Sequence, residues 1–239
     1  MADYNTIRTG AGAHTAEIDA GLRAHMNKVY GTMSVGLLLT ALVAWAVGTN
    51  ASLMATLFTG FTRYIVMFLP LIMVFAFGAM INRISAAGAQ LFFYVFSAAM
   101  GLSIAWIFAV YTGYSVTQTF LVTSAAFAGL SLYGYTTKKD ISAWGSFLIM
   151  GVIGLIIASI VNMFLGSGIV QLAISALGVL IFAGLTAYDT QKIKTTYLAH
   201  AHHGDSEWLA KSAIMGALNL YLDFVNLFMF LLSFMGNRN

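Results

Sequence analysis

Two aspartates near the end of the chain have the side chains and the positions best suited to chemistry. The first, Asp223, lies within an apolar run, Gly216–Gly236, that is long enough to cross a bilayer. If this helix enters the membrane near Ser212, Asp223 lies roughly 17 Å deep. An ionisable group at that depth costs several kcal/mol unless it is paired, protonated or hydrated. Asp223 is therefore a candidate functional residue.

The second aspartate, Asp189, closes the sixth apolar stretch in the segment GLTAYDTQKIK. It lies nearer the membrane surface, so a plain interfacial carboxylate beside Lys192 is the alternative interpretation. Arg83 ends the second apolar stretch in the segment MINRISA. The alternative interpretation of Arg83 is an ordinary basic residue that anchors the helix at the cytoplasmic boundary.

The chemistry of the two aspartates becomes specific if their side chains meet. Two carboxylates in a low-dielectric site resist being ionised together, so one keeps a proton and the pair titrates as a unit. With that proton they share a hydrogen bond that holds two helices together; without it they repel each other or attract a cation. A nearby Arg83 would favour the ionised form. The pattern predicts a switch that responds to cytoplasmic pH.

Small and polar side chains recur at three-, four- and seven-residue spacing along the last helix: Ser212, Gly216, Asn219, Asp223, Asn226 and Ser233. This polar stripe must face protein or a water-filled cavity, so we expect the helix at the centre of a bundle. Ionised Asp189 and Asp223, flanked by Asn219 and Asn226, would offer hard oxygen ligands that suit Ca²⁺. Because a tight calcium site needs about six to eight oxygens, we expect weak Ca²⁺ binding and no tightly bound cofactor.

The composition sets the fold class. Of 239 residues, 60% are hydrophobic and 8% are charged, whereas a soluble domain has about 25% charged residues. The chain is therefore predicted to be an all-α multi-pass membrane protein with the lipid bilayer as its surroundings. The absence of cysteine excludes disulfides and thiol chemistry. The net charge of +3 reflects membrane topology, and we expect no nucleic-acid partner.

Seven spans are predicted, at Val29–Gly48, Tyr64–Ile81, Gln90–Tyr111, Val116–Gly134, Ser142–Leu165, Val170–Tyr188 and Ser212–Met235. Nine of the 11 Lys and Arg residues lie inside if the amino terminus is cytoplasmic. The carboxyl terminus is then outside. Residues 1–28 are expected to form a loose cytoplasmic tail that leads into a short amphipathic entry segment, and residues 29–239 the membrane domain.

Three rows of small residues predict close helix packing: Ser97–Gly101–Ala105, Ala125–Gly129 and Gly154–Ala158. The segment Lys192–Lys211 is predicted to be a long loop. It contains His200, His202, His203, Asp205 and Glu207. These side chains could bind zinc, but their spacing matches no zinc-site pattern, so we expect a solvated polar loop.

The segments LTAYDTQKIK and ALNLYLDFVNLFMFLLSFMG closely resemble the Bax inhibitor-1 family, on its bacterial side, and the resemblance extends over nearly the whole chain from about Tyr30. It implies a seventh helix surrounded by the other six, in a bacterial inner membrane. It also implies a pH-dependent calcium leak. By position, Asp189 and Asp223 correspond to the family's pH-sensing pair, and Arg83 to the arginine proposed to latch the closed state. Relatives often carry arginine where this chain has Ser233, so no role is carried over to that residue.

The leading hypothesis is therefore a non-enzymatic, pH-gated leak for Ca²⁺ and other cations, with calcium ions and protons as its small partners. A second hypothesis is a non-catalytic regulator of a membrane protease or of stress or cell-death machinery, docking through the amino-terminal tail. A third is an intramembrane aspartyl protease. Against the third, Tyr221 and Leu222 precede Asp223 where those enzymes have a glycine-rich element, and Pro70 is the only proline.

Overall fold

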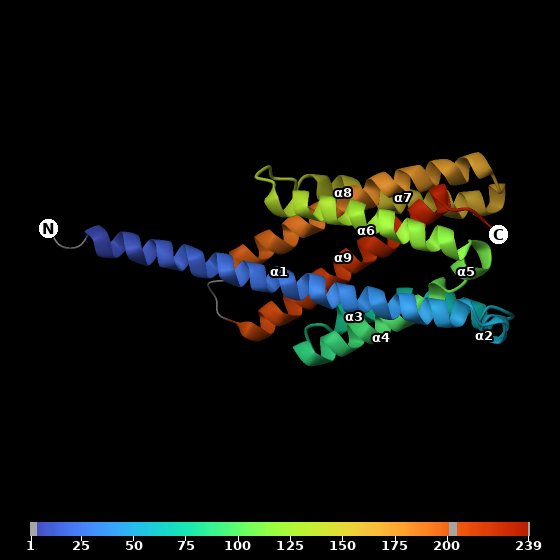
Figure 1. Ribbon diagram of the computed structural model, residues 1–239, viewed down its shortest axis with the longest axis horizontal. Coiled ribbons are helices and arrows are strands. Elements are labelled where there is room, and N and C mark those ends of the chain that lie inside the picture. Colours follow the sequence, from blue (N-terminus) through green and yellow to red (C-terminus); the bar gives the residue numbers. More distant parts are fainter. Residues whose placement is uncertain (1–3, 201–204, 239) are drawn as a thin grey trace.

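The protein is a bundle of long helices (Figure 1). The computed structural model describes residues 4–200 and 205–238, with side chains described from residue 18 onward. The described helices are α1 (Tyr4–Gly48), α2 (Ala51–Leu57), α3 (Thr62–Met80), α4 (Ala86–Ile104), α5 (Ile107–Val110), α6 (Gly113–Thr136), α7 (Trp144–Leu165), α8 (Gly168–His200) and α9 (Ser206–Met235).

Seven helical segments in the described residues are long and apolar enough to cross a membrane. They are α1 from Ile18 onward, α3, the stretch from α4 through α5, α6, α7, α8 and α9. This confirms the predicted all-α fold and its seven spans. The short helix α2 joins α1 to α3 on one side of the bundle.

Two segments predicted to be irregular are helical instead. Helix α1 begins at Tyr4, so residues 4–28 are not a loose tail. Helix α8 continues to His200 and α9 begins at Ser206, so most of the predicted loop is helix as well. The reason is burial: Leu22 and Met26 of α1 and Tyr197 of α8 belong to the main core, and packing extends helices past the end of the apolar run.

Helix α9 is the centre of the bundle (Figure 1). In its most apolar window 61% of residues are buried, against at most 39% for the other spans. It packs directly against α1, α4, α6 and α8, while α3 lies against α4 and α7 lies mainly against α8. The six other spans therefore surround α9, four in direct contact and two largely behind them.

A buried hydroxyl contact fixes one side of α9. The Tyr221 hydroxyl lies 2.6 Å from Thr40 Oγ1 of α1, and Thr40 Oγ1 lies 2.8 Å from the Ser97 carbonyl oxygen of α4. A Cβ added at Gly101 would approach the Thr40 carbonyl to 2.6 Å. The small-residue row of α4 is therefore a close packing surface, as predicted.

Of the two other predicted rows, Ala125–Gly129 is not a close packing surface, and in Gly154–Ala158 only Ala158 packs against a core cluster. A Cβ added at Gly129 or Gly154 would meet nothing within 4 Å, and Ala125 is exposed. The close approach between α6 and α8 lies instead at Gly134, where a Cβ would clash with the Ala187 carbonyl. Small residues permit close packing, but the partner helix decides which of them are used.

Candidate functional site

The candidate site lies where α8 packs against α9. The Asp189 and Asp223 carboxyl groups lie within hydrogen-bonding contact of each other. Asp223 is only 4% exposed, and Asp189 is partly buried. We call these two residues the acidic pair.

The acidic pair lacks a hydrogen-bond donor. Two ionised carboxylates only accept hydrogen bonds, so contact between them requires one proton. Within the described residues, Asp223 Oδ2 is buried and has no partner. A buried charged acceptor without a donor is costly, and a shared proton supplies the missing donor. The arrangement can therefore hold and release a proton between two helices.

Lys192, one turn further along α8, acts on Asp189 electrostatically. Its ammonium lies 5.8 Å from the centre of the Tyr188 ring, and its side chain is exposed. For Asp223, the recorded charged neighbour is Asp189 itself. The two aspartates therefore have different surroundings.

A chain of hydroxyls lies beside Asp189 on α8. Thr190 Oγ1 donates to the Thr186 carbonyl at 2.8 Å and lies 3.0 Å from Ser131 Oγ of α6. Ser131 Oγ in turn lies 2.5 Å from the Tyr30 hydroxyl of α1. Because the Thr190 proton is used on a carbonyl, Ser131 must donate to Thr190 and Tyr30 to Ser131. This chain ties three helices together next to the acidic pair.

A second polar cluster lies about 15 Å further along α9. Ser233 Oγ lies 2.8 Å from Ser175 Oγ and 3.3 Å from Gln171 Nε2 of α8. Asn162 Nδ2 of α7 donates to Gln171 Oε1 at 3.3 Å. We call these four residues, Asn162, Gln171, Ser175 and Ser233, the neutral cluster. It contains donors as well as acceptors and no carboxylate.

The other predicted site residues are less closely connected to the acidic pair. Asn226 donates from Nδ2 to the Leu222 carbonyl of its own helix at 2.8 Å, and Asn219 is partly buried. Arg83 lies in the turn between α3 and α4 and is exposed. Across residues 18–200 and 205–238 its side chain forms no ion pair or hydrogen bond. Its role as a latch stays a prediction.

The acidic residues of the predicted histidine loop have structural roles. Asp205 caps α9 by accepting from the Trp208 N–H at 3.0 Å. Glu207 accepts from the Ala86 N–H at 2.7 Å, which joins the starts of α9 and α4. His202 and His203 lie outside the described residues. The described residues contain no group of three His, Cys, Asp or Glu side chains that could hold a metal ion.

The hydroxyl chain was missed in the sequence. Thr186 and Thr190 are one turn apart on the helix that carries Asp189, which is a visible signal. Tyr30 and Ser131 are separated by 101 residues, and nothing in their local sequence links them. Only the packing of α1, α6 and α8 brings them together.

The sequence matches the family described as "Inhibitor of apoptosis-promoting Bax1" over residues 22–239. The inner membrane protein YbhL of Escherichia coli (strain K12) is 46% identical over 220 residues, covering 92% of this chain and 94% of that protein. An uncharacterized protein of Rickettsia prowazekii is 42% identical over 239 residues, covering 100% of this chain and 99% of the relative. The seven apolar helices and the YbhL similarity support a multi-pass inner membrane protein. The chain belongs to the Bax inhibitor-1 family.

Proposed function

We propose that this protein is a pH-sensitive leak pathway for Ca²⁺ and other cations, controlled by the acidic pair. The observation that carries the proposal is the buried contact between Asp189 and Asp223, two acceptor groups on adjacent helices. Ionisable groups buried within a membrane bundle are costly and mark ion or proton pathways. The acidic pair has the chemistry of both a proton sensor and a cation ligand.

The contact gives the direction of the pH response. With one proton shared, Asp189 and Asp223 hold α8 against α9 and the pathway is closed. When pH rises and that proton leaves, two adjacent carboxylates repel each other. The helices then separate, or a cation enters to neutralise the pair. We therefore expect flux to increase toward alkaline pH.

Calcium is the proposed permeant ion because both members of the pair offer hard oxygen ligands. Two carboxylates are far fewer than the about six to eight oxygens of a tight calcium site. Waters and backbone carbonyls must supply the remainder during passage. Weak binding suits a pathway, since an ion that binds tightly leaves slowly.

Calcium flux into proteoliposomes tests the proposal. The purified protein, Asp189→Asn and Asp223→Asn are compared from about pH 6 to 8, with Ser233→Ala as the control for a polar change on the same helix. One shared proton can change the open population by at most about tenfold per pH unit. We expect the parent and Ser233→Ala to respond to pH, and both Asn variants to lose the response.

Two results would change the proposal. If protein-containing and empty liposomes leak alike at every pH, the leak function fails. If flux rises toward acid instead, and Arg83→Gln removes that response, an arginine latch acting on the ionised pair holds the closed state. The second result would keep the acidic pair as the sensor but reverse the direction in which flux changes with pH.

A second function, regulation of a membrane protease or of stress or cell-death machinery, is favoured by the shape of α1. The amino-terminal part of α1 extends well beyond the other helices (Figure 1). A projecting helix is a ready docking element for a partner. Deleting residues 2–17, which precede the core residues Leu22 and Met26, should remove a cellular effect while flux persists. Loss of flux together with the effect would favour the leak alone.

The intramembrane protease hypothesis has no comparable support. A protease needs both aspartates open to a substrate and a water molecule. Asp223 is only 4% exposed. We therefore do not propose an enzymatic activity.

A further inference from the structure

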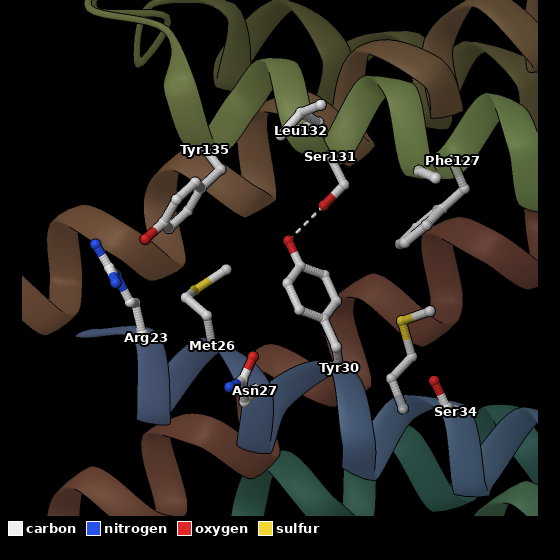
Figure 2. Close-up of a pocket in the computed structure, with 11 residues that line it drawn as sticks. Arg23, Met26, Asn27, Tyr30, Ser34, Phe127, Ser131, Leu132 and Tyr135 are labelled. Carbon is white, nitrogen blue, oxygen red and sulfur yellow. Dashed lines mark hydrogen bonds between the residues drawn. The ribbon is translucent and has the colours of Figure 1, made fainter. Parts of the chain in front are cut away.

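A cavity of about 600 Å³ lies between α1 and α6, on the part of the bundle near the end of α6 (Figure 2). Its apolar wall is formed by Met26, Met33, Phe127 and Leu132. Its polar groups include Arg23, Asn27, Tyr30, Ser131 and Tyr135. This volume falls within the range of sites for small molecules in proteins.

The cavity exists because α1 and α6 hardly pack directly against each other. Figure 2 shows the Tyr30–Ser131 hydrogen bond crossing the space between the two helices. Leu132, at the wall, is 64% exposed, and Ala128 is also exposed. Since α1 and α6 are both long and apolar enough to span a membrane, we expect lipid at the open side of the cavity. Lipid is therefore the molecule available to fill it.

The basic group that lines the cavity lies at one end of it. Arg23 and the Tyr135 hydroxyl lie at the same end, as Figure 2 shows, and the described residues that line the cavity include no carboxylate. Lys194 of α8 donates to the Tyr135 carbonyl at 2.7 Å, and Lys138 and Lys139 follow α6 directly. Asp19 is one turn from Arg23 on α1, but the two form no ion pair in the described structure.

We propose that this cavity binds an anionic phospholipid. The phosphate of the headgroup would bind the Arg23 guanidinium and the Tyr135 hydroxyl, because guanidinium groups pair well with phosphate oxygens. The first part of an acyl chain would lie along Met33 and Phe127. Basic pockets between membrane helices are known places for anionic headgroups. This proposal does not depend on the leak function.

Native mass spectrometry tests the proposal on the full-length protein in detergent. The probes are phosphatidylglycerol and phosphatidylcholine with the same acyl chains. We expect the protein to retain phosphatidylglycerol about tenfold better, and Arg23→Gln to remove most of that preference, a tenfold change being about 1.4 kcal/mol. Lys28→Gln is the matched charge control, because Lys28 is exposed on the same helix but does not line the cavity.

A second pair of variants tests the cavity itself without changing charge. Ala128→Trp fills the cavity and should reduce bound phosphatidylglycerol about as much as Arg23→Gln. Ala126→Trp adds the same ring at an exposed position of α6 outside the cavity and should leave retention unchanged. This pair keeps the proposal testable even if Arg23→Gln fails to fold.

Three results would overturn the proposal. The first is equal retention of the two lipids. The second is an equal loss in each test variant and its control, since general surface charge or surface area would then explain binding. The third is complete displacement of phosphatidylglycerol by soluble glycerol phosphate, which would identify a free phosphate compound as the ligand.

Discussion

The seam between α8 and α9 holds two polar clusters that differ in one respect. The acidic pair consists of two groups that only accept hydrogen bonds, and one of its oxygens is buried without a partner in the described structure. In the neutral cluster, hydroxyls and amides both donate and accept, so Ser233, Ser175 and Gln171 satisfy one another. The neutral cluster is complete at any pH, whereas the acidic pair is complete only with a proton. A cluster with both donors and acceptors can hold two helices together at any pH. A cluster of acceptors alone can do so only when a proton is bound.

The largest expected difference concerns stability against pH. If the acidic pair shares a proton as proposed, the unfolded chain releases that proton at neutral pH, so we expect stability to be lost as pH rises. Between pH 6 and 8 one proton accounts for at most about 2.7 kcal/mol, or about 5–10 °C in Tm. Thermal unfolding in detergent, followed by circular dichroism, measures this loss. In Asp189→Asn the slope should flatten, because the amide supplies a permanent donor. An unchanged slope would show that the pair shares no proton.

Removing a donor from the neutral cluster should have a smaller effect that is independent of pH. Ser233→Ala deletes the contacts with Ser175 and Gln171. A typical hydrogen bond contributes about 1 kcal/mol net, which corresponds to about 2–4 °C in Tm for a chain of this size. The same melting experiment at pH 6 and pH 8 should give equal losses. Unequal decreases in Tm at the two pH values would show that the neutral cluster also depends on pH.

Asn226 lies between the two clusters and should have the smallest effect. Its side chain bonds only to the Leu222 carbonyl of its own helix. We expect Asn226→Ala to change Tm by less than about 2 °C and to leave the pH dependence of calcium flux unchanged. A flattened flux profile in this variant would place Asn226 in the pathway and extend the acidic cluster along α9.

Much of the fold could be predicted from the sequence, because apolar runs of sufficient length can only be membrane helices. The positions of Asp223 and Asp189 also predicted the candidate site, since a charge in an apolar run is costly and usually has a function. The predictions failed where packing extends a helix beyond its apolar run. Residues 22–28 of α1 and the segment after Tyr188 continue as helix because Leu22, Met26 and Tyr197 reach the core, not because these segments are apolar throughout.

The amino-acid sequence by itself determined the number of spans, the central place of the last helix and the two candidate aspartates, because each follows from a pattern along a single helix. The tertiary structure alone decided which side chains meet. It joined Asp189 to Asp223, left Arg83 exposed in a turn, and linked Tyr30 to Ser131 beside an open cavity. Contacts between helices depend on the rotation and spacing of both partners. No pattern within one helix specifies those quantities.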